Sequence, residues 1–463
     1  MMKIKKASKL ARLSVAALLL SASIVAAQEV PENAAESAPV VVPETPAPVF
    51  VPAPAPVAVA VAEVAPAKPA ETVSATVAGT KISLYGRLEL NSAYETDVTD
   101  GLWSWRAPSG AKGDAQGRTS LSVARTRFGF NLEGPSKEGE PSLKGKFEAD
   151  FAGSDSYSNF NGSSGFRIRQ SWGSVTFKDI GLTLLFGQTD DVVNAIDPPS
   201  INPSSLNGSG NFGTRRPQIR LTQVIGPVDI AVAATHDRTY GYTARVNKEE
   251  VGAGGRADSA VSDAVAPSSP AVQGRLGLKV PASWAGEKAN LALGIGGLYG
   301  KNEGANLDDK NRFDRPEPSY VFGLDLSLPI IDILTLTGEF FSGQNLSRYG
   351  DGSMKQSRAY SDDGGIQSIG WWGGLSAKLP SDISAGAGIG SESLDKKSKR
   401  NGQPESNMFI FANLAYNFTS AAKVTFEYLT YSTDYAVFNG SDYDTSDNRS
   451  LNRFELNFRY DFK

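Results

Sequence analysis

The chain of 463 residues has no cysteine and only one histidine, His236. Without cysteine it can form no disulfide bond, thiolate metal site or thiol nucleophile, and it can carry no lipid on an N-terminal cysteine. A single histidine makes a Ser-His-Asp triad or a histidine-rich metal site a poor match to the sequence. We therefore expect no cofactor, no metal and no enzymatic activity.

The sequence also lacks an excess of positive charge and a long apolar run. Lys and Arg number 46 against 50 Asp and Glu, which gives a net charge of −4. Nucleic-acid binding needs cations to neutralise phosphates, so we expect no nucleic-acid partner. A membrane-spanning helix needs about 20 consecutive apolar residues, and no segment provides them.

Residues 1–27 have the pattern of a secretory signal peptide. A basic segment, "MMKIKKASKLAR", precedes the short apolar run "LSVAALLLSASIV". Val25 and Ala27 then occupy the positions three and one residues before a cleavage site at Gln28. The apolar run is too short for a membrane anchor. The sequence therefore predicts secretion through the inner membrane.

Residues 28–79 predict a periplasmic spacer without a packed core. Ten prolines lie between Pro31 and Pro69, interleaved mainly with Ala and Val. Proline fixes φ and has no backbone donor, so such a segment extends as a semi-rigid polyproline II chain. Two interpretations stay open for it: an inert tether, or a segment that contacts peptidoglycan.

From residue 80 onward, apolar and polar residues alternate in short segments. In the C-terminal segment "RFELNFRYDF", residues 453–462, every even-numbered residue is aromatic or Leu and every odd-numbered one is polar. Successive side chains of a strand point to opposite faces, so this strand has one apolar and one polar face. About 16 such segments recur between clusters of Gly, Pro, Asn, Asp and Ser.

The connections between these segments alternate in length. Short ones such as "GP" at 226 and "PS" at 380 alternate with long ones rich in Gly, Ser, Asn and Asp. This pattern predicts an all-β protein: a transmembrane antiparallel β-barrel of about 16 strands over residues 80–463, with short periplasmic turns and long extracellular loops. A closed barrel leaves no backbone edge unpaired, so its apolar face would contact outer-membrane lipid. A soluble β-sandwich, the alternative, would have to bury too many charged faces.

The connection "DDVVNAIDPPSINPSSLNGSGNFGTR" is long, rich in proline and partly apolar. A barrel of about 16 strands is wide enough for a water-filled channel. The apolar side chains of this connection need burial, so we expect residues 189–215 to fold into the lumen as a constriction loop. A surface loop packed on its neighbours is the alternative.

The polar faces of the early strands carry a run of arginines, in "SVARTRFGF", "FRIRQSW" and "RRPQIRLTQ". Spacing of i, i+2 puts each pair on one face, and neighbouring strands would stack the pairs into a ladder. Guanidinium groups bind carboxylates bidentately, which favours anions or carboxylates; mutual compensation by acidic residues is the alternative. The predicted pore-lining residues are Arg87, Arg125, Arg127, Arg167, Arg169, Arg216, Arg220, Glu148, Asp150, Asp190, Asp191 and Asp197.

These segments resemble those of Gram-negative trimeric porins, and within them the DcaP-like outer-membrane porins. The resemblance covers residues 80–463 and is carried by "KISLYGRLELNSAY", "FRIRQSWGSVTFKDIGLTLLFGQTDD", "RRPQIRLTQ" and "FELNFRYDF". It implies that the third long loop constricts the pore, that arginines line the constriction and that three copies form a homotrimer. It also implies that Phe462 is the signal for the barrel-assembly machinery, although Lys463 follows it where the family pattern ends.

The sequence thus predicts a porin of the outer membrane that passes small hydrophilic solutes by passive diffusion. Two alternatives stay open. The barrel could be structural and anchored to the cell wall through the N-terminal tether. It could also enclose an enzyme, although the scarcity of histidine argues against this.

Overall fold

The computed structural model describes residues 73–97, 106–107, 117–135, 137–153, 165–236, 269–302, 317–346, 366–394, 404–437 and 445–463. The chain divides into two units, Met1–Glu71 and Thr72–Lys463. The predicted signal peptide and most of the predicted spacer lie outside the described residues.

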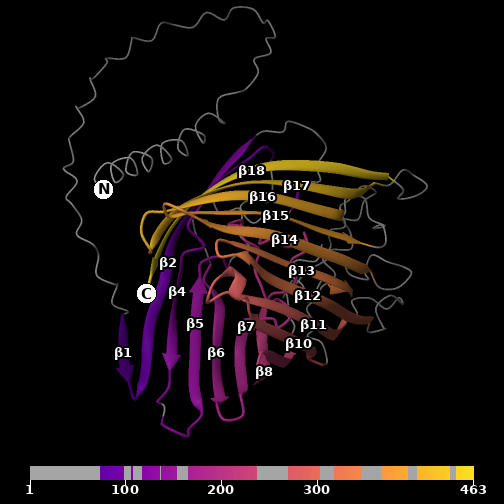
Figure 1. Cartoon of the computed structure of the whole chain (residues 1–463). Coiled ribbons are helices and arrows are strands. Elements are labelled where there is room, and N and C mark those ends of the chain that lie inside the picture. The colour runs from indigo at the N-terminus through magenta and orange to yellow at the C-terminus, as the bar shows by residue number, and fades with distance from the viewer. Residues whose placement is uncertain are drawn as a thin grey trace, which may run out of the picture. The chain divides into compact units, whose positions relative to one another are not determined.

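The described strands form one antiparallel sheet that closes on itself as a barrel (Figure 1). They are β1 (Ser74–Val77), β2 (Thr80–Glu95), β3 (Arg118–Ser122), β4 (Arg127–Glu133), β5 (Ser142–Asp150), β6 (Arg167–Phe177), β7 (Leu182–Asp190), β8 (Arg215–Ile225), β9 (Val228–Thr235), β10 (Ala271–Pro281), β11 (Asn290–Asn302), β12 (Glu317–Ile331), β13 (Leu334–Gln344), β14 (Gln367–Leu379), β15 (Ile383–Leu394), β16 (Pro404–Asn417), β17 (Ala422–Val437) and β18 (Thr445–Phe462). A single 3₁₀ turn, η1 (Ser283–Ala285), lies between β10 and β11.

The last strand closes the barrel against the first long one. β18 pairs with β2 from Arg453 opposite Glu95 to Phe462 opposite Gly86. The barrel has 16 strands, because β3 and β4 are two parts of its second strand and β1 only extends an edge. The predicted fold class and strand number are therefore confirmed, and the second barrel strand is interrupted between Ser122 and Arg127.

The apolar face of the strands points outward. In β18, Phe458 and Tyr460 are 41% and 50% exposed, whereas Arg453 and Glu455 are 0% and 2% exposed. The aromatic face of the C-terminal segment thus lies on the outside of the barrel, as the alternation predicts. The polar face lies inside.

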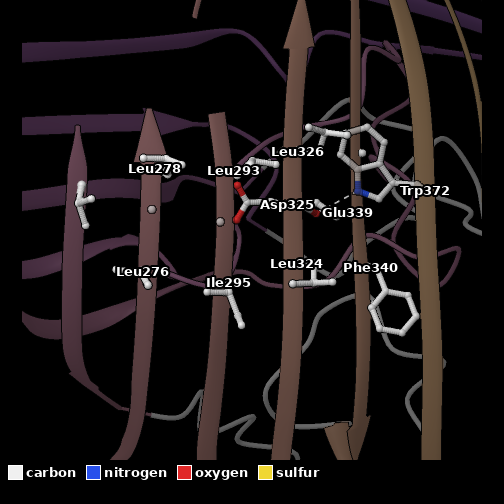
Figure 2. Close-up of a pocket in the computed structure, with 14 residues that line it drawn as sticks. Leu276, Leu278, Leu293, Ile295, Leu324, Asp325, Leu326, Glu339, Phe340 and Trp372 are labelled. Carbon is white, nitrogen blue, oxygen red and sulfur yellow. Dashed lines mark hydrogen bonds between the residues drawn. The ribbon is translucent and has the colours of Figure 1, made fainter. Parts of the chain in front are cut away.

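The outer rows are visible on β10–β13. Leu276, Ile295, Leu324 and Phe340 form one row across these strands, whereas Asp325 and Glu339 belong to the opposite face (Figure 2). A hollow of about 690 Å³ is lined mainly by the outward aliphatic residues. It is therefore a depression in the outer surface and not part of the channel.

The barrel sheet begins within the range predicted for the spacer. β1 pairs with the start of β2, from Ser74 opposite Ser83 to Val77 opposite Thr80. Ala78 and Gly79 join them with φ of 49° and 78°, the left-handed geometry of a two-residue hairpin turn. β1 is therefore part of the barrel sheet although it lies within residues 28–79.

No helix among the described residues has the length and apolar character needed to span a membrane.

Candidate pore constriction

An interruption in the second barrel strand places Arg125. Between β3 and β4, the backbone N–H of Thr126 donates to the carbonyl of Val123 at 2.9 Å, which turns the chain. The Thr126 hydroxyl accepts the backbone N–H of Glu89 at 3.2 Å and so ties the turn to β2. Arg125 lies in this turn, with Nε 3.2 Å from the Glu89 carboxylate and Nη1 donating to the carbonyl of Ile201 at 2.5 Å.

A bulge in β6 brings two arginines to one carboxylate. The pairing with β5 shifts by one residue after Glu148, which leaves Arg169 as the additional residue of β6. Asp150 accepts two hydrogen bonds from Arg167, at 2.9 and 2.7 Å, and one from Arg169 at 3.0 Å. Glu148 accepts Nε of Arg169 at 2.9 Å and lies 3.1 Å from Nη1 of Arg127. The early arginines thus form two adjacent groups of ion pairs on β2–β6 and the turn before β4, one around Glu89 and one around Glu148 and Asp150. We call the two groups together the arginine wall.

The arginine wall presents cations, because its carboxylates lie behind them. The side chains of Glu89, Glu148 and Asp150 are 2%, 7% and 1% exposed. Five arginine side chains share these three carboxylates and are between 11% and 27% exposed: Arg87, Arg125, Arg127, Arg167 and Arg169. A solute in the lumen would therefore meet guanidinium groups held rigidly from behind.

The constriction loop, residues 191–214, is tied at its root by a buried ion pair. Nε of Arg216 lies 2.9 Å from Asp191, and neither side chain is exposed. The Asp191 carboxylate also accepts the side-chain amide of Gln273 at 2.7 Å and the backbone N–H of Thr214 at 3.0 Å. The sequence predicts that Arg216 and Asp191 line the pore, but both side chains are fully buried. Their ion pair therefore has a structural role.

The other root residues surround Asp190. Its carboxylate accepts the side-chain amide of Gln170 at 2.7 Å and lies 3.6 Å from Nη1 of Arg215. Arg220 donates to the Asp190 carbonyl and to Oε1 of Gln218. Asp190 and Arg220 thus lie at the base of the loop rather than in the arginine wall.

The middle of the loop is held by the carboxylate of Glu427 on β17. That carboxylate accepts the hydroxyl of Ser200 at 2.7 Å and the backbone N–H groups of Ile201 and Asn202 at 3.0 and 3.1 Å. It also accepts the side-chain amide of Asn413 at 2.8 Å. Glu427 is fully buried, so these donors replace the water that its charge would otherwise need.

Two further inward carboxylates hold the loop. Glu455 accepts the side-chain amide of Asn202 at 2.5 Å and pairs with Arg453 at 2.7 Å. Glu339 accepts the backbone N–H of Ile196 at 3.3 Å and the indole N–H of Trp372 at 3.0 Å (Figure 2). We call the inner face of β13–β18 the loop seat.

Apolar contacts and a glycine beneath the loop complete the loop seat. Leu206 is buried with Trp372, and the same cluster contains Phe409, Phe411, Leu429, Tyr431 and Leu451. Gly390 of β15 lies directly under the loop: a Cβ there would be 2.2 Å from the carbonyl oxygen of Ser209. Only glycine permits this approach, so the sequence of β15 helps to fix where the loop runs.

Asp197 is the one predicted carboxylate whose side chain no hydrogen bond or ion pair engages in the described part of the chain. It belongs to the loop and is exposed. Surrounding protein nevertheless raises the pKa of Asp197 by desolvation, and the charge of Asp190 adds to this effect. Arg215, Arg169 and Arg127 act in the opposite direction. A negative group on the loop therefore shares the field of the arginine wall.

The structure brings together seven of the twelve predicted pore residues in the arginine wall, leaves Asp197 on the loop, and moves four to the loop root. The sequence does not predict the residues of the loop seat. The only indication of these residues in the sequence is that polar residues such as Glu427 and Asn407 occupy inward-facing positions of the late strands. Among the described residues, no group of three or more His, Asp or Glu side chains is arranged to hold a metal ion.

Comparison with known proteins gives a likeness in fold. No protein-family model matches the chain, and no curated protein matches its sequence. Among solved structures, the outer membrane channel DcaP of Acinetobacter baumannii aligns with a TM-score of 0.64 and 18% identity, over 83% of this chain and 98% of that one.

Two further structures agree in fold. An anion-selective porin from Comamonas acidovorans aligns with a TM-score of 0.52 and 14% identity, over 83% of this chain and 100% of that one. OmpT, an outer membrane protein of Vibrio cholerae, aligns with a TM-score of 0.51 and 11% identity, over 85% and 100%. The chain therefore has the 16-stranded barrel fold of outer-membrane porins and channels. Within that class, its fold is similar to that of DcaP.

Proposed function

We propose that the protein is an outer-membrane porin that lets small hydrophilic solutes diffuse passively and favours anions, carboxylates in particular. The chain makes and breaks no bond in this role. Selection comes from the width of the lumen and from the field of its charged groups.

The proposal rests on the arrangement of charges in the arginine wall, where the arginines are more exposed than the carboxylates that bind them. Guanidinium groups face the lumen, and the carboxylates that balance them in part are nearly buried. Lys146, 3.9 Å from Glu148, adds a further cation. Guanidinium retains its charge and offers paired donors that match a carboxylate, so an anionic solute gains contacts that a cation lacks.

The location and assembly belong to the same proposal. Residues 1–27 would direct secretion, and the protein would reach the outer membrane with Phe462 recognised by the barrel-assembly machinery. Three copies would associate in the lipid, as the resemblance to trimeric porins implies. The N-terminal tether would lie in the periplasm, where contact with peptidoglycan is a separate possibility to test.

The test is the reversal potential of single channels in a planar bilayer under a KCl gradient, with and without succinate. We expect stable conductance steps, chloride preferred over potassium, and a reduced chloride current when succinate enters the constriction. A folded barrel without conductance would overturn the porin assignment. Cation preference would overturn the role of the arginine wall alone.

A further inference from the structure

A buried chain of hydrogen bonds links the connection between β2 and β3 to the constriction loop. The backbone N–H of Ala107 donates to the hydroxyl of Thr433 at 3.0 Å, and that hydroxyl donates to Oδ1 of Asn407 at 2.6 Å. Nδ2 of Asn407 then donates to the carbonyl of Gly208 at 3.1 Å and to the hydroxyl of Ser209 at 2.6 Å. The path crosses the loop seat through one side chain of β17 and one of β16.

All members of this path are sealed from water. Ala107, Thr433, Asn407 and Ser209 are each 0% exposed. The Thr433 hydroxyl has one proton, which it uses on Asn407 while it accepts from Ala107, and this orients the Asn407 amide toward the loop. Loss of that hydroxyl would remove the acceptor of the Ala107 N–H and a donor to Oδ1 of Asn407 at a buried place, which is costlier than the loss of an exposed hydrogen bond.

Ala107 is itself held firmly. The Tyr435 hydroxyl donates to the Ala107 carbonyl, and the guanidinium of Arg106 lies 6.0 Å from the centre of the Tyr435 ring. Ala107 also belongs to the apolar cluster that contains Leu206 of the constriction loop. The first long connection and the constriction loop therefore share both a polar path and an apolar contact.

We propose that Thr433 and Asn407 are positioning residues of the constriction, which couple the seat of residues 206–209 to Ala107. The inference rests on the proposed function in one respect: the loop seat matters for permeation only if the lumen conducts. The coupling itself is a property of the barrel interior. It makes the width of the channel depend on Ala107, a buried residue outside the arginine wall.

The test measures how often the loop leaves its seat. The chain has no cysteine, so Leu206→Cys adds one reporter thiol at a position that is 0% exposed. Labelling of the full-length protein by a charged methanethiosulfonate then requires the loop to move. Thr433→Val removes the hydroxyl at nearly constant shape, and Thr433→Ser retains it. Thr430→Val, on the opposite face of β17, is the matched control.

We expect Thr433→Val to speed labelling about tenfold over Thr433→Ser, in keeping with about 1.4 kcal/mol for a buried hydrogen-bond partner. Thr430→Val should label at the rate of the parent. Adding Ser209→Ala to Thr433→Val should have less than its separate effect, because both break one path. In single channels, Thr433→Val should increase transitions between conductance levels without changing the ion preference.

Equal labelling of the Val and Ser variants would overturn the proposal, and so would equal effects of Thr433→Val and Thr430→Val. Should Thr433→Val fail to fold, the comparison of Ser209→Ala with the parent gives the same two outcomes, because it removes an acceptor at the loop end. Labelling requires no ion flow. Absence of conductance would therefore overturn the proposed function and leave the coupling intact.

Discussion

The arginine wall and the loop seat both contain inward-facing carboxylates, but these carboxylates bind different partners. On β2–β6, Glu148 and Asp150 bind arginine side chains and leave guanidinium groups facing the lumen. On β13–β18, Glu427 binds backbone N–H groups of the loop and leaves nothing charged exposed. The partner of a carboxylate, rather than its position in the alternating pattern, decides whether it shapes the field or fixes the backbone.

The largest effect should come from removing charge from the arginine wall. Arg127→Gln with Arg169→Gln leaves Glu148 without the two arginines nearest to it. We expect the anion-to-cation permeability ratio to fall on the order of tenfold, because each charge a few ångströms from a permeating ion contributes about 1 kcal/mol even in water. The reversal potential measures this ratio.

Arg275→Gln is the matched control for that double variant. Arg275 is also an inward arginine, but it is bound between Asp325, at 2.8 Å, and Asp229, at 3.3 Å. An equal fall in the permeability ratio with this control would show that any lumen cation suffices, and would contradict a special role of the arginine wall.

A smaller effect on ion preference, and a larger one on conductance, should follow from Glu427→Ala. The substitution leaves the hydroxyl of Ser200 and two backbone N–H groups without their buried acceptor, at about 1–3 kcal/mol for each donor that stays dry. We expect the loop to leave its seat and single-channel conductance to change, while chloride remains preferred. Glu133→Ala, at an exposed pair with Lys81, should leave both quantities as in the parent.

Gly390→Ala should displace the loop by one methyl group. Its new Cβ would lie 2.2 Å from the carbonyl oxygen of Ser209, whereas at Gly373 a Cβ meets nothing within 4 Å. We expect Gly390→Ala to cost about 1–3 kcal/mol, as overpacking does, and to lower the temperature at which the folded barrel loses its heat-resistant mobility in gel electrophoresis. Gly373→Ala should leave that temperature unchanged; equal shifts would argue against close packing of the loop.

The smallest effect should be a pH dependence from Asp197. An ordinary aspartate has a pKa near 4. The pKa of Asp197 is raised, so Asp197 takes up its proton at a higher pH than an ordinary aspartate does. As pH falls from 7, anion preference should rise modestly, and Asp197→Asn should show the raised preference already at pH 7. The neutral form also favours folding, so the contribution of Asp197 to stability is present at low pH and is lost as pH rises through the raised pKa. A titration identical in parent and Asp197→Asn would assign the step to another group.

The sequence predicts the strands of the barrel wall more completely than the contacts in the interior. Alternation is local, so residues 453–462 alone predict which face of β18 meets lipid. The i, i+2 spacing likewise predicts that Arg167 and Arg169 share a face, but it does not predict the bulge at Arg169 that interrupts the alternation. Arg125 differs, because its position depends on a turn between β3 and β4 that the pattern reads as continuous strand. Arg216 differs too, since only the folded loop root shows that Asp191 covers it.

The loop seat could not be read from the chain in the same way. Asn202 and Glu455 are 253 residues apart, and their contact depends on the path of the loop across the lumen. The alternating pattern does not distinguish Gly390 of β15 or Asn407 of β16 from other inward positions. Their role comes from contact with the loop backbone, at Ser209 and Gly208, and local periodicity does not predict that contact.

The edge of β2 sets the order in which this protein can be completed. β1 pairs with residues Thr80–Ser83 and needs only a two-residue turn, so that contact can form as soon as the hairpin is made. The remaining edge up to Glu95 waits for β18, at the far end of the chain. Pairing across so many residues is slow because of the closure entropy. Until the final strand arrives, the exposed edge is the place where a chaperone or an assembly factor would have to bind, and where a chain cut short before β18 would aggregate.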